Sequence, residues 1–376
     1  MIPRLLTRTV LVLVLGSTPA FAQGRPPAPP APSAPPAPPA PSAPSAPSTP
    51  APKIRRWLDV QSLQFASRFR WIESSRGTVN SSTLQWQPQV RARFLFDARS
   101  RYSVNVGAFS GSTLISGWNN TGGGIGDYTG AFNVKQLFLS AEPVKGAEFQ
   151  AGGLYMNRGE QTELTSYDND SFIVGERATI RPSKGALTQV AITAGYYGDY
   201  REPNFFTRAD RLNEWNYGQV LVGLKLGPRA AASADYTYEA GRDIVREAVT
   251  IRAPAKTKVL TSVKLEAYQR LENGNGLLLN KRGAGFHVSS DLRVKRLTVT
   301  VGVASVDRYY GPYNGDRYDV GSRVYTIGTY TLTRDVTLGW FHGEAFNVDY
   351  PIANKHRWEA IVTINPTASL KRARIF

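Results

Sequence analysis

The chain has 376 residues, no cysteine and a formal net charge of +16, from 45 Lys+Arg against 29 Asp+Glu. The lack of cysteine excludes disulfides, cysteine-based metal sites and a cysteine-linked lipid anchor, so stability must come from packing and hydrogen bonding. The length allows one large all-β domain or two ordinary domains, and the basic balance favours an anionic partner such as nucleic acid, lipid headgroups or small anions.

The N-terminus has the three parts of a secretory signal peptide. Arg4 and Arg8 form the positive region, residues 10–15 form a short apolar core, and Ala20-Phe21-Ala22 is a small-x-small cleavage site. We therefore expect residues 1–22 to be removed after Ala22 and the protein to be exported, which argues against a nucleic-acid partner. No later stretch of the chain approaches the roughly 20 apolar residues that a membrane-spanning helix needs.

Residues 23–56 are rich in Pro, Ala and Ser and cannot form a core. We expect a disordered, extended polyproline-II tail that rises about 3 Å per residue and lies in the periplasm. Its composition leaves two roles open, which are a solvated tail and a contact with peptidoglycan or a periplasmic partner.

From Trp57 onward, apolar residues recur with the two-residue period of β-strands. In LQWQPQVRARFLFD, residues 84–97, the even positions are apolar, whereas the odd positions include Arg91 and Arg93. Pro88 interrupts this strand. Because proline cannot donate to a strand ladder, we expect a bulge or a broken hydrogen bond there.

The connections between the expected strands alternate in length along the chain. Short ones fall near residues 97–100, 142–146, 181–185, 227–229, 253–256, 291–296 and 333–335. Long ones fall near residues 74–82, 110–130, 157–171, 198–213, 271–281, 307–321 and 343–354, and the brief join at 240–243 belongs to this series by position. Short periplasmic turns and long outer loops are typical of a transmembrane barrel, whereas a soluble sandwich has no reason to segregate them.

We therefore predict an all-β fold, a transmembrane antiparallel β-barrel of about 16 strands over residues 57–376. A strand such as residues 84–96 spans roughly 40 Å at about 3.3 Å per residue, or about 30 Å once tilted, which covers a hydrocarbon core. Aromatic residues expected near strand ends fit an interfacial girdle: Trp71, Trp86, Phe96, Tyr155 and Trp340.

This pattern of strands and loops resembles a Gram-negative outer-membrane porin, over residues 57–376 and without a family-specific motif. The resemblance implies a passive channel for small hydrophilic solutes in the outer membrane, in contact with lipid and lipopolysaccharide and without a cofactor. It leaves open whether the barrels form homotrimers. The terminal Phe376 is a known feature of such barrels, but the last residues, LKRARIF, do not alternate. We expect the last strand to end near residues 365–366, with a short basic tail after it.

If the apolar positions face lipid, parity places charged side chains inside the barrel. We predict a lumen lined with arginine and lysine that attracts anions, and its candidate residues are Arg68, Arg70, Arg91, Arg93, Arg177 and Lys264. Two interpretations stay open. The cations select anions, or they only pair with acids across neighbouring strands.

The third outer loop, residues 157–171, is acidic. In general porins this loop folds into the barrel and its acids face an arginine wall, so the resemblance implies a candidate constriction loop with Glu160, Glu163, Asp168 and Asp170. The alternatives are a solvated outer loop and a loop that binds divalent cations between lipopolysaccharides. We predict no protein metal site, because the DND triplet lacks the ligand spacing and glycine of a calcium loop.

His287 and Ser289 resemble the His-x-Ser pair of outer-membrane lipid hydrolases. Here parity places both in the lumen rather than against lipid, and the following strand offers no acidic partner. We therefore predict a channel and not an enzyme. Two alternatives stay open, which are a structural or adhesive barrel with a plugged lumen and a barrel lipid hydrolase.

Overall fold

The computed structural model describes residues 57–114, 116–161, 171–239, 241–271, 283–307, 320–347 and 354–375. The predicted signal peptide and Pro-rich tail lie outside the described residues, as do Glu163, Asp168, Asp170 and Phe376. Within the described ranges, no helix is long and apolar enough to cross a membrane.

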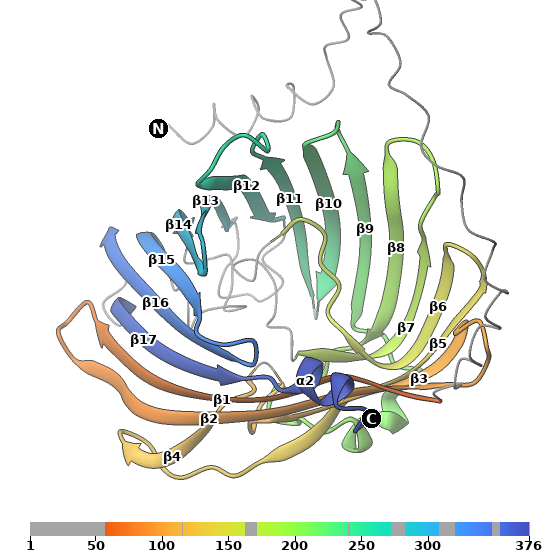
Figure 1. Ribbon diagram of the computed structural model, residues 1–376, viewed down its shortest axis with the longest axis horizontal. Helices are drawn as coiled ribbons and strands as arrows, with labels where there is room; N and C mark the ends of the chain where they lie inside the picture. Colours follow the sequence, from red (N-terminus) through yellow and green to blue (C-terminus); the bar gives the residue numbers. More distant parts are fainter. Residues whose placement is uncertain are drawn as a thin grey trace, which may run out of the picture. The chain divides into compact units, whose positions relative to one another are not determined.

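Seventeen strands form one antiparallel sheet. Their bounds are β1 Leu58–Ser74, β2 Val79–Leu95, β3 Tyr102–Ser110, β4 Asn119–Gly124, β5 Phe132–Val144, β6 Ala147–Tyr155, β7 Phe172–Ile180, β8 Leu187–Tyr196, β9 Tyr217–Lys225, β10 Ala230–Glu239, β11 Arg242–Arg252, β12 Leu260–Arg270, β13 Ala284–Val294, β14 Leu297–Val306, β15 Gly321–Thr331, β16 Val336–Asn347 and β17 Asn354–Ile364. Because β1 pairs with both β2 and β17, the sheet closes on itself (Figure 1). β3 pairs directly with β5, and β4 extends the edge of β2, so sixteen strands form the barrel wall and the predicted fold is confirmed.

The connections at the two ends of the barrel differ in length, as predicted. At one end they are residues 96–101, 145–146, 181–186, 226–229, 253–259, 295–296 and 332–335. At the other end they are residues 75–78, 111–131, 156–171, 197–216, 240–241, 271–283, 307–320 and 348–353. One departure is the first connection of the second series, which is a tight hairpin turn and not a long loop. Closure leaves the wall without a free sheet edge, which a lipid environment requires.

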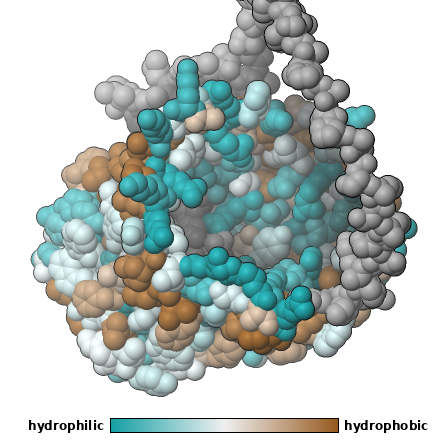
Figure 2. All heavy atoms as spheres, in the orientation of Figure 1, coloured by the Kyte–Doolittle hydropathy of each residue, from teal (hydrophilic) through white to brown (hydrophobic). Residues whose placement is uncertain are grey.

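Side chains alternate between the two faces of the wall. On β1, Phe65 and Phe69 are 45% and 48% exposed, whereas Arg68 between them is 3% exposed. On β2, Leu84 is exposed and Gln85 is buried. Figure 2 shows the same separation, with hydrophilic residues gathered in the hollow of the barrel and hydrophobic residues over much of its outside. The outer surface therefore suits lipid, and the inner surface suits water.

Pro88 lies in a regular ladder on one side of β2 and between two different partner strands on the other side. Toward β1 the register runs through Phe65↔Pro88 without a shift, so the expected bulge is absent on that edge. On the other edge, β2 pairs with β3 from Gln89 and with β4 up to Trp86, so Pro88 lies where β2 changes partner. A proline, which cannot donate to a strand ladder, is best tolerated at such an interruption.

Two outer connections cover part of the outside of the wall. Phe172 and Val174 at the start of β7 face outward but are fully buried. Leu114 from the connection after β3 and Phe205 of η1 (Phe205–Thr207) pack against them. The Leu114 N–H donates to the Tyr200 carbonyl at 2.6 Å, which joins the two connections. These contacting parts of the two connections therefore lie against the barrel exterior.

The seam between the first and last strands is partly closed by a helix. β17 ends before it reaches the start of β1, and α2 (Thr367–Arg372) covers the edge that remains. The Leu63 N–H donates to the Thr367 hydroxyl at 2.7 Å, and Lys371 Nζ donates to Asp59 Oδ1 at 2.8 Å. The segment expected to be a basic tail is thus a helix bound to the wall.

Candidate functional site

The arginines of the first hairpin lie on one inner wall. Arg68 is buried, and its guanidinium donates to Gln85 Oε1 at 2.9 and 2.5 Å. Arg70 lies opposite Glu359 in the ladder with β17. On β2, the guanidinium of Arg91 lies 5.0 Å from the centroid of the Phe109 ring. The wall therefore carries fixed cations, as parity predicts, and these cations have polar, acidic or aromatic neighbours.

Asp59 pairs with the fourth of these arginines because of a β-bulge. The register of β1 shifts between Val60 and Ser62, which reverses the alternation and turns Asp59 into the lumen opposite Arg93. Arg93 Nη2 lies 3.3 Å from Asp59 Oδ2, whereas Lys371 Nζ lies 2.8 Å from Asp59 Oδ1. One carboxylate therefore serves two cations. Sequence reasoning missed Asp59, because simple parity places it outside.

Glu359 of β17 is shared in the same way. Its Oε1 lies 3.0 Å from Arg68 Nη1 and 2.5 Å from Arg357 Nη2. All three side chains are at most 3% exposed, so the cluster is a buried part of the wall. Removing one partner from such a buried cluster is costly, because it leaves a charge uncompensated.

Arg177 of β7 faces the lumen without a carboxylate partner among the described residues. It donates to Thr193 Oγ1 at 3.0 Å, to Gln150 Oε1 at 3.2 Å and to the Tyr155 carbonyl at 2.6 Å. These neutral acceptors satisfy hydrogen bonds but do not cancel the charge. Lys264 of β12 lies opposite Thr250 and is half-buried on the inner face.

Tyr155 lies in the lumen and not in the outer girdle, so that expectation is wrong. The Arg177 guanidinium lies 4.7 Å from the centroid of its ring. Tyr155 is the last residue of β6, and the connection that follows it enters the lumen, where its carbonyl accepts a hydrogen bond from Arg177.

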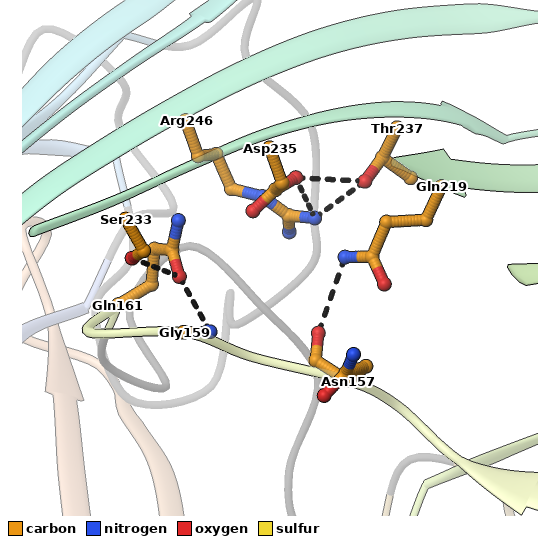
Figure 3. A network of polar contacts seen from close by, with 8 residues as sticks. All are labelled: Asn157, Gly159, Gln161, Gln219, Ser233, Asp235, Thr237 and Arg246. Atoms are coloured by element: carbon orange, nitrogen blue, oxygen red, sulfur yellow. Dashed lines mark hydrogen bonds and ion pairs between the residues drawn. The ribbon is translucent and has the colours of Figure 1, made fainter. Parts of the chain in front are cut away.

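The connection after β6 enters the lumen and is anchored to the inner faces of β9 and β10 (Figure 3). The Glu160 N–H donates to Ser233 Oγ at 2.7 Å, and that hydroxyl donates to Gln161 Oε1 at 3.1 Å. Gln219 Nε2 donates to the Asn157 carbonyl at 3.1 Å. These contacts place the described start of the loop against β9 and β10, away from the arginines of β1 and β2. Its role as a constriction stays a prediction.

Beside this anchor, Arg246 of β11 and Asp235 of β10 form a buried pair. Arg246 Nη2 lies 2.7 Å from Asp235 Oδ1 and donates to Thr237 Oγ1 at 2.6 Å (Figure 3). Because the register places the two residues directly opposite each other, the pair neutralises itself within the wall. Asp235 faces the lumen by parity, but nothing in the local pattern of β11 indicates which acid Arg246 meets.

His287 and Ser289 both face the lumen, where they are 1% and 5% exposed. His287 Nε2 is hydrogen-bonded to the Tyr325 hydroxyl, and its Nδ1 lies 3.5 Å from Glu266 Oε2. The acidic neighbour of His287 comes from the preceding strand, β12. From the sequence, it was sought in the strand that follows. Within the described residues no hydrogen bond joins His287 to Ser289, so the histidine is not placed to activate that serine.

A closed antiparallel barrel with a charged inner wall and a loop anchored inside it defines a porin-like membrane barrel. Among solved structures, the chain is similar to a mutant of the Rh. blastica porin, with 10% identity, coverage of 82% of this chain and 99% of that one, and a TM-score of 0.51. It is also similar to Salmonella typhi OmpF in its complex with Daunomycin, with 10% identity, coverage of 82% and 97%, and a TM-score of 0.54. No family model and no curated protein matches the sequence. The chain therefore has the porin fold, and its function rests on its own residues.

Proposed function

We propose that the protein is an outer-membrane channel through which small hydrophilic solutes diffuse passively, with a preference for anions. Its tight turns face the periplasm, its long loops face outward, and its outer surface contacts membrane lipid and lipopolysaccharide. The similarity of the fold to solved porin structures supports this assignment. The mechanism is diffusion along a wet, charged lumen, so no catalytic residue is required.

The observation that carries the anion preference is the sharing of carboxylates on the inner wall. Asp59 holds Arg93 and Lys371, and Glu359 holds Arg68 and Arg357. Among the described residues, each of these sets places two cations on one carboxylate. A surrounding low-dielectric wall focuses such a field into the lumen and raises the local concentration of anions. The Arg246–Asp235 pair sets one acid against one base, as simple pairing across strands expects, whereas these two sets place one acid between two bases.

Arg177 gives the most direct test of this proposal, because it has no carboxylate partner in the described part of the chain. Replacement with glutamine removes one positive charge and leaves hydrogen-bonding capacity in its place. We expect Arg177→Gln to lower the anion-to-cation permeability ratio roughly twofold, measured as the zero-current potential of a planar bilayer in a salt gradient. Arg334→Gln, in an exposed turn, loses the same charge outside the lumen and is the matched control. An equal effect of both substitutions would refute the role of the wall.

A plugged structural or adhesive barrel is the second candidate, and one observation favours it. In the outer half of the lumen, Tyr217, Tyr268, Tyr325 and Phe341 are at most 4% exposed. If aromatic side chains filled the outer half of the lumen, they would block the passage of solutes. The two candidates differ in a simple result, because the channel conducts in a planar bilayer and the plugged barrel is silent.

A further inference from the structure

A cavity of about 220 Å³ lies on the inner wall, lined from β1, β2, β3, β5 and β6. Its position is the half of the barrel nearest the tight turns, because Arg91 and Arg93 come late in β2 and Ser103 comes early in β3. Most of its lining side chains carry a charge, an amide or a hydroxyl group. The cavity is therefore a polar recess beside the route that a solute takes through the lumen.

The cavity is electropositive, because the acid on its edge is already compensated. Glu148 lies 2.7 Å from Arg181 Nη1 and also accepts hydrogen bonds from Ser140 at 2.8 Å and Gln150 at 2.7 Å. Arg93 shares its carboxylate with Lys371, as described above. The arginines that line the cavity therefore face it with more positive than negative charge around them, which favours an anionic ligand.

The remaining polar groups suit a ligand with several hydroxyls. Ser103 and Asn105 lie side by side on β3, where Asn105 Nδ2 donates to Ser103 Oγ at 3.1 Å. Gln61, in the bulge of β1, adds a further amide to the lining. Amide groups both donate and accept, and a hydroxyl does the same, so they match a polyhydroxylated molecule better than a simple inorganic ion.

An aromatic pair completes the lining. Phe138 and Tyr155 lie with ring centroids 6.1 Å apart, at an angle of 60°. Such rings offer an apolar surface for the carbon face of a sugar ring. In liquid water the cavity volume corresponds to about seven molecules at ~30 Å³ each. That is room for a single sugar unit.

We propose that this cavity is a binding subsite for monosaccharide acids, with the carboxylate on the two arginines, the hydroxyls on the amides of β1 and β3, and the ring against Phe138 and Tyr155. The proposal rests on the channel function, since the ligand reaches the cavity through the lumen. It narrows the substrate class from small anions in general to hydroxylated carboxylates. Arginine suits this role because its fork binds a carboxylate with two parallel hydrogen bonds.

The test is block of chloride current by glucuronate in a planar bilayer that contains the full-length mature protein. We expect glucuronate to lower the current with a half-effect in the millimolar range, about tenfold below the concentration needed for acetate or glucose. Acetate has the carboxylate without the hydroxyls, and glucose has the hydroxyls without the carboxylate, so each lacks one half of the recognition. Arg93→Gln should weaken glucuronate block about tenfold or more, and Arg334→Gln should retain the block of the unmodified protein.

Arg91→Lys and Asn105→Leu provide independent variants if Arg93→Gln does not fold, as judged by heat-modifiable migration on a gel. Arg91→Lys keeps the charge but loses bidentate binding, and Asn105→Leu removes hydroxyl recognition at similar volume. We expect both to narrow the difference between glucuronate and acetate. An anion-selective channel on which glucuronate acts no more strongly than acetate would overturn the subsite and leave the proposed function intact. A silent or cation-selective barrel would overturn both.

Discussion

Asp59 holds two cations with one carboxylate, and the reason is a local change in the strand. The bulge at Gln61 turns Asp59 inward beside Arg93, and α2 brings Lys371 to the same carboxylate. Parity predicts the inward direction of Arg68, Arg91 and Arg93 correctly, because no register shift interrupts β1 around Arg68 or the pairing of β2 with β3 around Arg91 and Arg93. It fails for Asp59, because a bulge reverses the alternation and leaves no unique mark in the sequence. It also fails for Tyr155, whose ring lies in the lumen at the end of β6.

Asp59→Asn should increase anion selectivity. The substitution removes the one negative charge that Arg93 and Lys371 share, so both cations act on the lumen without compensation. We expect the anion-to-cation permeability ratio to rise roughly twofold, with the effect reduced at high salt because the Debye length falls. Asp210→Asn makes the same charge change in an exposed outer connection and is the control. An unchanged ratio for Asp59→Asn would show that this cluster does not influence permeation.

Asp97 makes the stability of the turn between β2 and β3 depend on pH. Burial opposes its ionisation, but hydrogen bonds from the backbone N–H groups of Tyr102, Arg101 and Arg99 and from the Arg101 side chain outweigh it, and they hold the pKa of Asp97 below its ordinary value. A depressed folded pKa adds stability above the ordinary pKa, which is lost as the pH falls through the folded pKa.

The expected result is a loss of heat stability in the wild-type protein as the pH falls below about 4, and a smaller loss in Asp97→Asn. The measurement is the temperature of heat-modified gel migration between neutral and acidic pH. Parallel curves for the two proteins would contradict the contribution of this turn.

At the scale of the elements, α2 stabilises the seam of the barrel. Its Thr367 hydroxyl accepts from the Leu63 N–H, and Ser369 donates to Asp335 Oδ1 at 2.8 Å in the last tight turn. The helix was not predicted, because six residues of sequence without a strong periodicity carry little information about structure that tertiary contacts stabilise. The hairpin turn between β1 and β2 was also missed, because the polar residues at the ends of two long strands resemble a loop.

Thr367→Val should weaken the seam. The substitution preserves shape but leaves the Leu63 N–H without its acceptor, which costs on the order of 1–3 kcal/mol when the group is buried. We expect a lower midpoint for unfolding in urea, followed by tryptophan fluorescence and by heat-modifiable migration. Arg374→Gln, which lies beyond the helix and is exposed, should leave the midpoint unchanged. A Thr367→Val midpoint equal to that of the wild type would show that α2 does not hold the seam.

At the scale of the whole molecule, the alternating lengths of the connections predicted the barrel and its strand number. Closure requires an even number of strands when both ends lie on the same side, and the two-residue period indicates which face is wet. The pairing of charges on the inner wall could not be predicted from the sequence. Glu359 lies between Arg68 and Arg357 only because the last strand meets the first, and a contact across that seam has no signature in either segment alone.

The zero-current potential of the wild-type protein in a planar bilayer, under a tenfold gradient of potassium chloride, tests the central claim most directly. An inner wall on which one carboxylate lies between two cations predicts stepwise single-channel conductance and a potential of the sign set by chloride. A potential of the sign set by potassium, or a barrel that inserts without conducting, would contradict it.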